Sequence, residues 1–214
     1  FSNIRRMLTY LLATNIGEVM VTLGALILGM PMPLQPIQIL WINLVTDTTM
    51  VIPLGLEPGE KSVMKRKPIN PKAPILGKYM ISRIILMALS MATLSLIIYS
   101  IYSDKYGAAY GQTIVFVTLV AVQWANAFNA RSTYDSLFTR LKVWHGPFWA
   151  GITIAITMQA LALFGPLQGA LHVNPVAIGD IFVATLIAFA VAIIPVEIHK
   201  WFGRRLLRTG HTTR

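Results

Sequence analysis

The stretch "LWINLVTD", residues 40–47, lies inside an apolar segment and places three polar side chains there, Asn43, Thr46 and Asp47. An apolar segment of this kind is expected to cross a membrane as a helix, because a helix satisfies its own backbone hydrogen bonds in hydrocarbon. An ionisable side chain at that depth is costly and usually marks a route for an ion or a proton. The stretch therefore predicts a membrane-spanning helix with a part in ion movement.

The rest of the chain has the composition of a multi-span membrane protein. Its 214 residues are 55% hydrophobic and 12% charged, which is about half of the charged fraction of a soluble domain. The predicted fold is a single domain, 1–214, an all-α bundle of six transmembrane helices over residues 8–29, 36–56, 79–102, 111–130, 148–167 and 178–201. The absence of Cys excludes thiol catalysis, disulfides and thiolate metal sites.

The net charge of +10 is explained by the loops rather than by nucleic-acid binding. All Lys and Arg residues except Lys105 fall in or beside the termini and the second and fourth loops between the predicted spans. Positive loops face the cytoplasm. The alternation predicts an even number of spans with both termini cytoplasmic, and no nucleic-acid partner.

Two acidic residues, Glu18 and Asp47, lie deep in the apolar segments, whereas the other six are expected near water in loops or at span ends. Residues three and four apart share one face of a helix. This spacing predicts one polar, oxygen-bearing stripe on each of the first, second and fourth spans, formed by Asn15 and Glu18, by Asn43, Thr46 and Asp47, and by Gln123, Asn126 and Asn129.

These side chains suit a hard cation. Ca²⁺ takes six to eight oxygen ligands from carboxylates, amides, backbone carbonyls and water, and two carboxylates balance one divalent ion. Gly17 beside Glu18 and Pro53 after Asp47 are expected to loosen their helices and release backbone carbonyls. The plainer alternative is that amides in membrane helices hydrogen-bond neighbouring helices, and for the stripe that begins at Gln123 this alternative is favoured.

At these residues the chain resembles the C-terminal membrane half of the P-type cation pumps, most closely the Ca²⁺-transporting ATPases. The matching motifs are "NIGEV" at 15–19, "LWINLVTD" at 40–47, "LGLEPGEKSVMKRKPINPKAPIL" at 54–76 and "QWANAFNARS" at 123–132. The resemblance covers essentially the whole chain. It implies that the six spans are pump helices five to ten.

The resemblance implies that the transported cation, most closely Ca²⁺, is held by Asn15, Glu18, Asn43, Thr46, Asp47, Gln123 and Asn126. Gln123 and Asn126 stand where family members have acids, which favours one Ca²⁺ per cycle or another cation. Met50 replaces a proline of the family, and Pro53 follows three residues later, so the unwound part of this helix is expected to be shorter or shifted.

The family's phosphorylation motif D-K-T-G-T, its T-G-E and G-D-G-x-N-D motifs and its fourth helix are not in this sequence. ATP and Mg²⁺ would therefore act only through parts outside it, and the chain alone is not expected to be catalytic. It begins with Phe and is interpreted as part of a longer polypeptide.

The expected partners are the lipid bilayer and the rest of the pump, in the plasma or inner membrane of a prokaryote. Alternatives are a pump for Na⁺, H⁺ or Mn²⁺, and a free-standing six-helix subunit with a scaffold role in a larger complex. A secondary carrier is disfavoured, because no internal repeat is seen.

Overall fold

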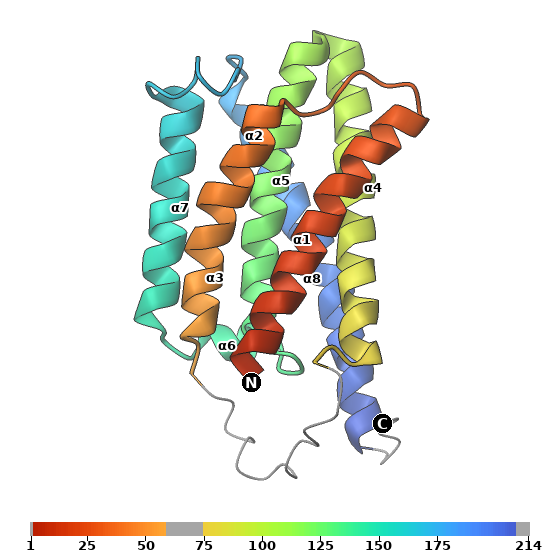
Figure 1. The fold of residues 1–214 in the computed structure, drawn as a ribbon, viewed down its shortest axis with the longest axis vertical. Coiled ribbons are helices and arrows are strands. Elements are labelled where there is room, and N and C mark those ends of the chain that lie inside the picture. Colours follow the sequence, from red (N-terminus) through yellow and green to blue (C-terminus); the bar gives the residue numbers. More distant parts are fainter. Residues whose placement is uncertain (1, 59–74, 209–214) are drawn as a thin grey trace.

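The computed structural model describes residues 2–58 and 75–208 (Figure 1). Six helical segments in this part are long and apolar enough to cross a membrane, which confirms the six predicted spans. Their elements, in chain order, are α1 (Ser2–Ile27), α2 (Pro36–Trp41), the π-helix η1 (Ile42–Thr46), α3 (Asp47–Gly55), α4 (Lys78–Tyr106), α5 (Ala108–Ala130), the short α6 (Leu137–Leu141), α7 (Gly146–Phe164) and α8 (Ile178–Arg208).

The second span is a composite of α2, η1 and α3, and the central helix of the bundle is α5. The side chains of α5 are almost all buried, and the helix contacts α1, α3, α4 and α8. In Figure 1, α7 and the composite span lie on one side of α5 and α4 on the other. Most of the basic loop predicted between the second and third spans lies outside the described residues.

The first residues of α1 and the last residues of α8 lie at the same end of the bundle (Figure 1). This arrangement agrees with the even number of spans predicted from the charges. That this end faces the cytoplasm stays a prediction from the distribution of Lys and Arg.

Two glycines allow close helix packing. A Cβ at Gly17 of α1 would lie 2.7 Å from Met91 Sδ on α4, and a Cβ at Gly151 of α7 would overlap the Thr49 carbonyl oxygen on α3. That carbonyl has no α-helical donor, because its partner four residues on is Pro53. Small residues at such contacts let membrane helices approach closely.

The expected loosening at Gly17 is wrong, whereas at Pro53 the helix continues but the Thr49 carbonyl loses its α-helical donor, as expected. α1 continues through Gly17, and α3 continues through Pro53. The hydrogen-bond pattern widens instead before Asp47, at Ile42–Thr46, where the Asp47 N–H donates to the Ile42 carbonyl.

Acidic residues near the ends of α8 have structural partners. Asp180 accepts hydrogen bonds from Tyr102 and Tyr110, and Glu197 pairs with Lys200 at 3.3 Å. Glu57 departs from the prediction that it lies near water, since it is 2% exposed. The Glu57 carboxylate accepts a hydrogen bond from Arg131, which lies 74 residues away in the chain. No local sequence pattern predicts that contact.

Candidate cation site

The carboxylate of Glu18 joins three membrane spans. Asn43 of η1 donates from Nδ2 to Glu18 Oε2 at 2.7 Å, and Gln123 of α5 donates from Nε2 to Glu18 Oε1 at 2.7 Å. Glu18 is 5% exposed and Gln123 is fully buried. Hydrogen bonds to an ionised carboxylate are stronger than neutral ones, so the two amides orient Glu18 as an acceptor between the helices.

Asp47, the first residue of α3, lies next to this group. It is 5% exposed, its polar neighbours are Tyr10 and Asn15 of α1, and its charge interacts with that of Glu18. Within the described part of the chain, Asp47 Oδ1 is buried without a hydrogen-bond partner. Two ionised carboxylates buried together repel each other and lose hydration, so the pair requires a cation or protons.

The π-helix places the polar residues of the second span. Asn43 and Thr46 lie inside η1, and Asp47 closes it. Single π-turns inside α-helices are frequently found at functional sites. Here the wider turn lets Asn43 reach Glu18 while Thr46 and Asp47 stay buried against the bundle.

The predicted residues do not all converge. Asn15 donates to the Leu11 carbonyl at 2.8 Å, which leaves its oxygen for other contacts. Asn126 is 3% exposed, and among the described residues its Nδ2 and Gln123 Oε1 have no partner. Asn129 instead donates to the Ala192 carbonyl of α8 at 2.9 Å, a contact between helices of the kind that the plainer alternative predicts.

Tyr10 lies at the site although it was not among the residues predicted for it. Its side chain is fully buried and is a neighbour of Asp47. The available signal was a hydroxyl two helical turns before Glu18 in the same apolar span. Its aromatic body made it resemble ordinary bundle packing.

The polar group is open on one side of the bundle. A cavity of about 350 Å³ is lined by Asn15, Asn43 and Asp47, and another of about 330 Å³ by Asn15, Glu18 and Asn43. The two asparagines lie between the cavities and line both. Exposed apolar side chains of α1 and of the composite span also line the cavities, including Val19 and Ile52.

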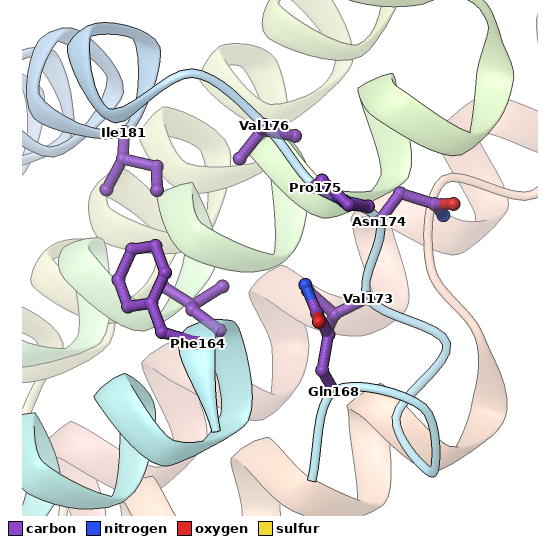
Figure 2. A pocket seen from close by; sticks show the side chains of 8 residues that line it. Phe164, Gln168, Val173, Asn174, Pro175, Val176 and Ile181 are labelled. Atoms are coloured by element: carbon purple, nitrogen blue, oxygen red, sulfur yellow. The ribbon is translucent and has the colours of Figure 1, made fainter. Parts of the chain in front are cut away.

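A third cavity, of about 300 Å³, lies between the end of α7 and the segment leading into α8 (Figure 2). Its lining consists of apolar side chains and the amides of Gln168 and Asn174. Because this lining offers only two polar side chains and no carboxylate, it does not provide the ligand set of a hard cation.

The six spans and the buried polar site together define the class of protein. The protein is a multi-pass integral membrane protein whose helix bundle holds a carboxylate-containing, oxygen-rich site between three spans.

Comparison with known proteins gives the family. Residues 31–202 match the family described as "Cation transporting ATPase, C-terminus", and the chain belongs to this family, as the membrane C-terminal part of a cation-transporting ATPase. It is 38% identical to a calcium-transporting ATPase of Bacillus subtilis over 84% of this chain and 20% of that protein. It is 28% identical to a calcium-transporting ATPase of Plasmodium falciparum over 100% of this chain and 21% of that protein.

A probable cation-transporting ATPase F of Mycobacterium tuberculosis is 30% identical over 77% of this chain and 18% of that protein. The chain thus spans about a fifth of the length of the curated relatives it matches. The Bacillus and Mycobacterium relatives support a prokaryotic plasma membrane.

Proposed function

We propose that this chain is the membrane part of an ATP-driven pump whose cargo is Ca²⁺. The proposed ligands are oxygens of Asn15, Glu18, Asn43, Thr46, Asp47 and Gln123, with Asn126 beside them. The observation that carries the proposal is the buried Glu18 carboxylate, held by Asn43 and Gln123 next to Asp47.

The chemistry of these side chains favours a hard cation. The candidate ligands bear carboxylate, amide and hydroxyl oxygens and include no imidazole or sulfur, which softer transition metals prefer. Two carboxylates with amide and hydroxyl oxygens suit Ca²⁺, and calcium transport is the printed activity of the relatives from Bacillus and Plasmodium. Gln123 donates to Glu18 rather than adding a charge, which supports one divalent ion per cycle.

The open side of the site supports a further protein partner. Asn15, Asn43 and Asp47 line cavities among side chains that would otherwise face lipid. Polar side chains inside a membrane face a protein interior or a water-filled cavity. We infer that the rest of the pump covers this side and completes the ligand set, with a carboxylate that the resemblance implies on its fourth helix.

The steps that supply energy for transport lie outside this chain. ATP and Mg²⁺ would bind the cytoplasmic domains, and phosphorylation there would tilt the helices that carry the site. In that mechanism Glu18 and Asp47 release the cation to the far side of the membrane and take up protons. The buried, closely spaced carboxylates are what such an exchange needs, because they cannot both stay ionised and unpaired.

The test is equilibrium binding of radioactive Ca²⁺ to the purified full-length protein, with Na⁺ and Mn²⁺ as competitors. We expect one saturable Ca²⁺ per protein and an affinity about tenfold or more lower in Glu18→Gln. Asp104→Asn, at an exposed acid of α4, is the matched control and should bind like the wild type. Stronger binding of Mn²⁺ or Na⁺ would replace Ca²⁺ as the cargo, and no saturable cation binding would overturn the proposal.

A further inference from the structure

The carboxylate of Glu57, two residues beyond α3, is buried against two basic side chains. Arg131 Nε donates to Glu57 Oε1 at 3.0 Å and to Oε2 at 3.1 Å. His145 Nδ1 lies 3.0 Å from Glu57 Oε2. The Arg131 side chain is 1% exposed and the Glu57 side chain is fully buried. We call Glu57, Arg131 and His145 the Glu57 cluster.

The Glu57 cluster holds the ends of four membrane spans together. Asn3, at the start of α1, donates to the carbonyls of Gly55 at 2.8 Å and Glu57 at 3.0 Å. Arg131 follows α5 directly, donates from Nη2 to the Val143 carbonyl at 2.9 Å, and stacks over the Phe148 ring of α7. His145 is the N-cap of α7. The end of α3 is thus fixed to α1, α5 and α7.

Helical segments connect this cluster to the cation site. α3 runs unbroken from Asp47 to Gly55, a rise of about 12 Å. On α5, Gln123 lies seven residues before Ala130, the last residue of that helix, a rise of about 10 Å. Helices resist compression along their axes. The contact between Glu57 and Arg131 therefore also fixes the position of Asp47 along the bundle relative to Gln123. Through the Asn3 contacts it fixes the position of Asp47 relative to Glu18 as well.

Stability alone does not account for such a pair. Removing two charges from water costs free energy, and apolar replacements of a buried pair are often as stable. The planar guanidinium does impose a defined geometry, because its Nε–H is shared between both Glu57 oxygens while Nη2 donates to the Val143 carbonyl. The structure therefore favours a role in the register of the helices over a role in overall stability.

We propose that Arg131 is a positioning residue for the cation site, acting through Glu57 on the axial position of α3. The inference rests on the proposed function for its effect on the cation, although not for its effect on α3. It assigns Arg131 no contact with the cation.

The test compares four forms of the full-length protein: wild type, Arg131→Lys, the apolar pair Glu57→Leu/Arg131→Met, and the control Glu197→Gln/Lys200→Met. The control removes another ion pair, whose two residues lie three positions apart on α8 and therefore do not tie α3 to another span. For each form, Ca²⁺ affinity, melting temperature and amide exchange of Val51–Glu57 are measured.

We expect the apolar pair to melt close to the wild type while its Ca²⁺ affinity falls about tenfold. Arg131→Lys keeps the charge but not the planar group that bonds Glu57 and the Val143 carbonyl together, so its affinity should fall about threefold at an unchanged melting temperature. The control should stay within about twofold of wild-type affinity. Wild-type affinity in Arg131→Lys or in a folded apolar pair would overturn the positioning role.

The measurements separate a failure of the positioning role from a failure of the proposed function. A wild-type protein that binds no cation refutes the proposed function by that result alone. Amide exchange of Val51–Glu57 then decides the role of Arg131: about tenfold faster exchange in Arg131→Lys, with α8 unchanged, supports positioning. Wild-type exchange in that variant overturns it.

Discussion

Gln123 on α5 donates a 2.7 Å hydrogen bond to Glu18 on α1, although the two residues are 105 positions apart. Through this contact a neutral amide of the central helix donates a hydrogen bond to a buried carboxylate. Glu18 also accepts from Asn43, so the carboxylate has one amide on each oxygen. The predictions below follow from this arrangement and from the helix contacts that support it.

Asp47→Asn should abolish Ca²⁺-dependent phosphorylation of the full-length protein by ATP. Asp47 supplies the second carboxylate and has a buried oxygen, Oδ1, without a partner among the described residues, and an amide cannot neutralise the ion. The measurement is phosphoenzyme formation as a function of Ca²⁺ concentration.

Asp180→Asn is the control for Asp47→Asn, since Asp180, near the start of α8, bonds Tyr102 and Tyr110 and none of the proposed ligands. It should leave the Ca²⁺ dependence unchanged. Normal Ca²⁺ dependence in Asp47→Asn would show that Asp47 is not a ligand.

Gln123→Glu should lower the melting temperature in a Ca²⁺ chelator and enlarge the stabilisation that Ca²⁺ produces. Without the cation, the change replaces a donor to Glu18 with a second buried negative charge. With the cation, it adds a charged ligand, so affinity or stoichiometry should rise. Gln123→Met is the control, because it removes the hydrogen bond without adding charge. Identical Ca²⁺ titrations for Gln123→Glu and the wild type would limit Gln123 to helix association.

Gly151→Ala should destabilise the protein by about 1–3 kcal/mol. The added methyl group would overlap the Thr49 carbonyl oxygen and lie 2.8 Å from Pro53 Cγ, so α3 and α7 must separate. The melting temperature reports the loss. Gly179→Ala has open space around it and should melt like the wild type. Equal melting temperatures for the two variants would mean that the contact between α3 and α7 is not tight.

Arg83→Met should destabilise the protein by roughly 3 kcal/mol. The buried guanidinium of Arg83 donates to the carbonyls of Asn129, Ser132 and Thr133 at the end of α5, and it complements the negative end of that helix. The measurement is the melting temperature in detergent, compared with Lys78→Met at the start of the same helix α4. A melting temperature equal to that of Lys78→Met would mean that α5 ends without needing this cap.

The sequence was sufficient for the spans and for most of the candidate residues. Hydropathy fixes which segments enter a membrane, because the cost of burying charge there exceeds most packing terms. The same argument singles out Glu18 and Asp47, and helical spacing adds Asn15, Asn43 and Thr46.

Other features could not be predicted from local patterns. Gln123 and Asn129 share a stripe, yet one bonds Glu18 and the other bonds α8, because the neighbours of each helix decide the partner. The second span widens at the π-helix Ile42–Thr46, ahead of Asp47, whereas α1 continues through Gly17 and α3 continues through Pro53. The sequence suggests that Tyr10 is a packing residue, and only the structure shows that it lies beside Asp47.

The sequence by itself therefore determined that this is a six-span membrane protein with two costly acids among amide and hydroxyl side chains. Only the tertiary structure decided which amide orients which carboxylate, where the second span widens, and how Glu57 becomes buried through Arg131. The physical reason is the range of each interaction. Transfer into the bilayer depends on the composition of a segment of about 20 residues, whereas hydrogen bonds and buried ion pairs depend on angstrom-scale contacts between residues far apart in the chain.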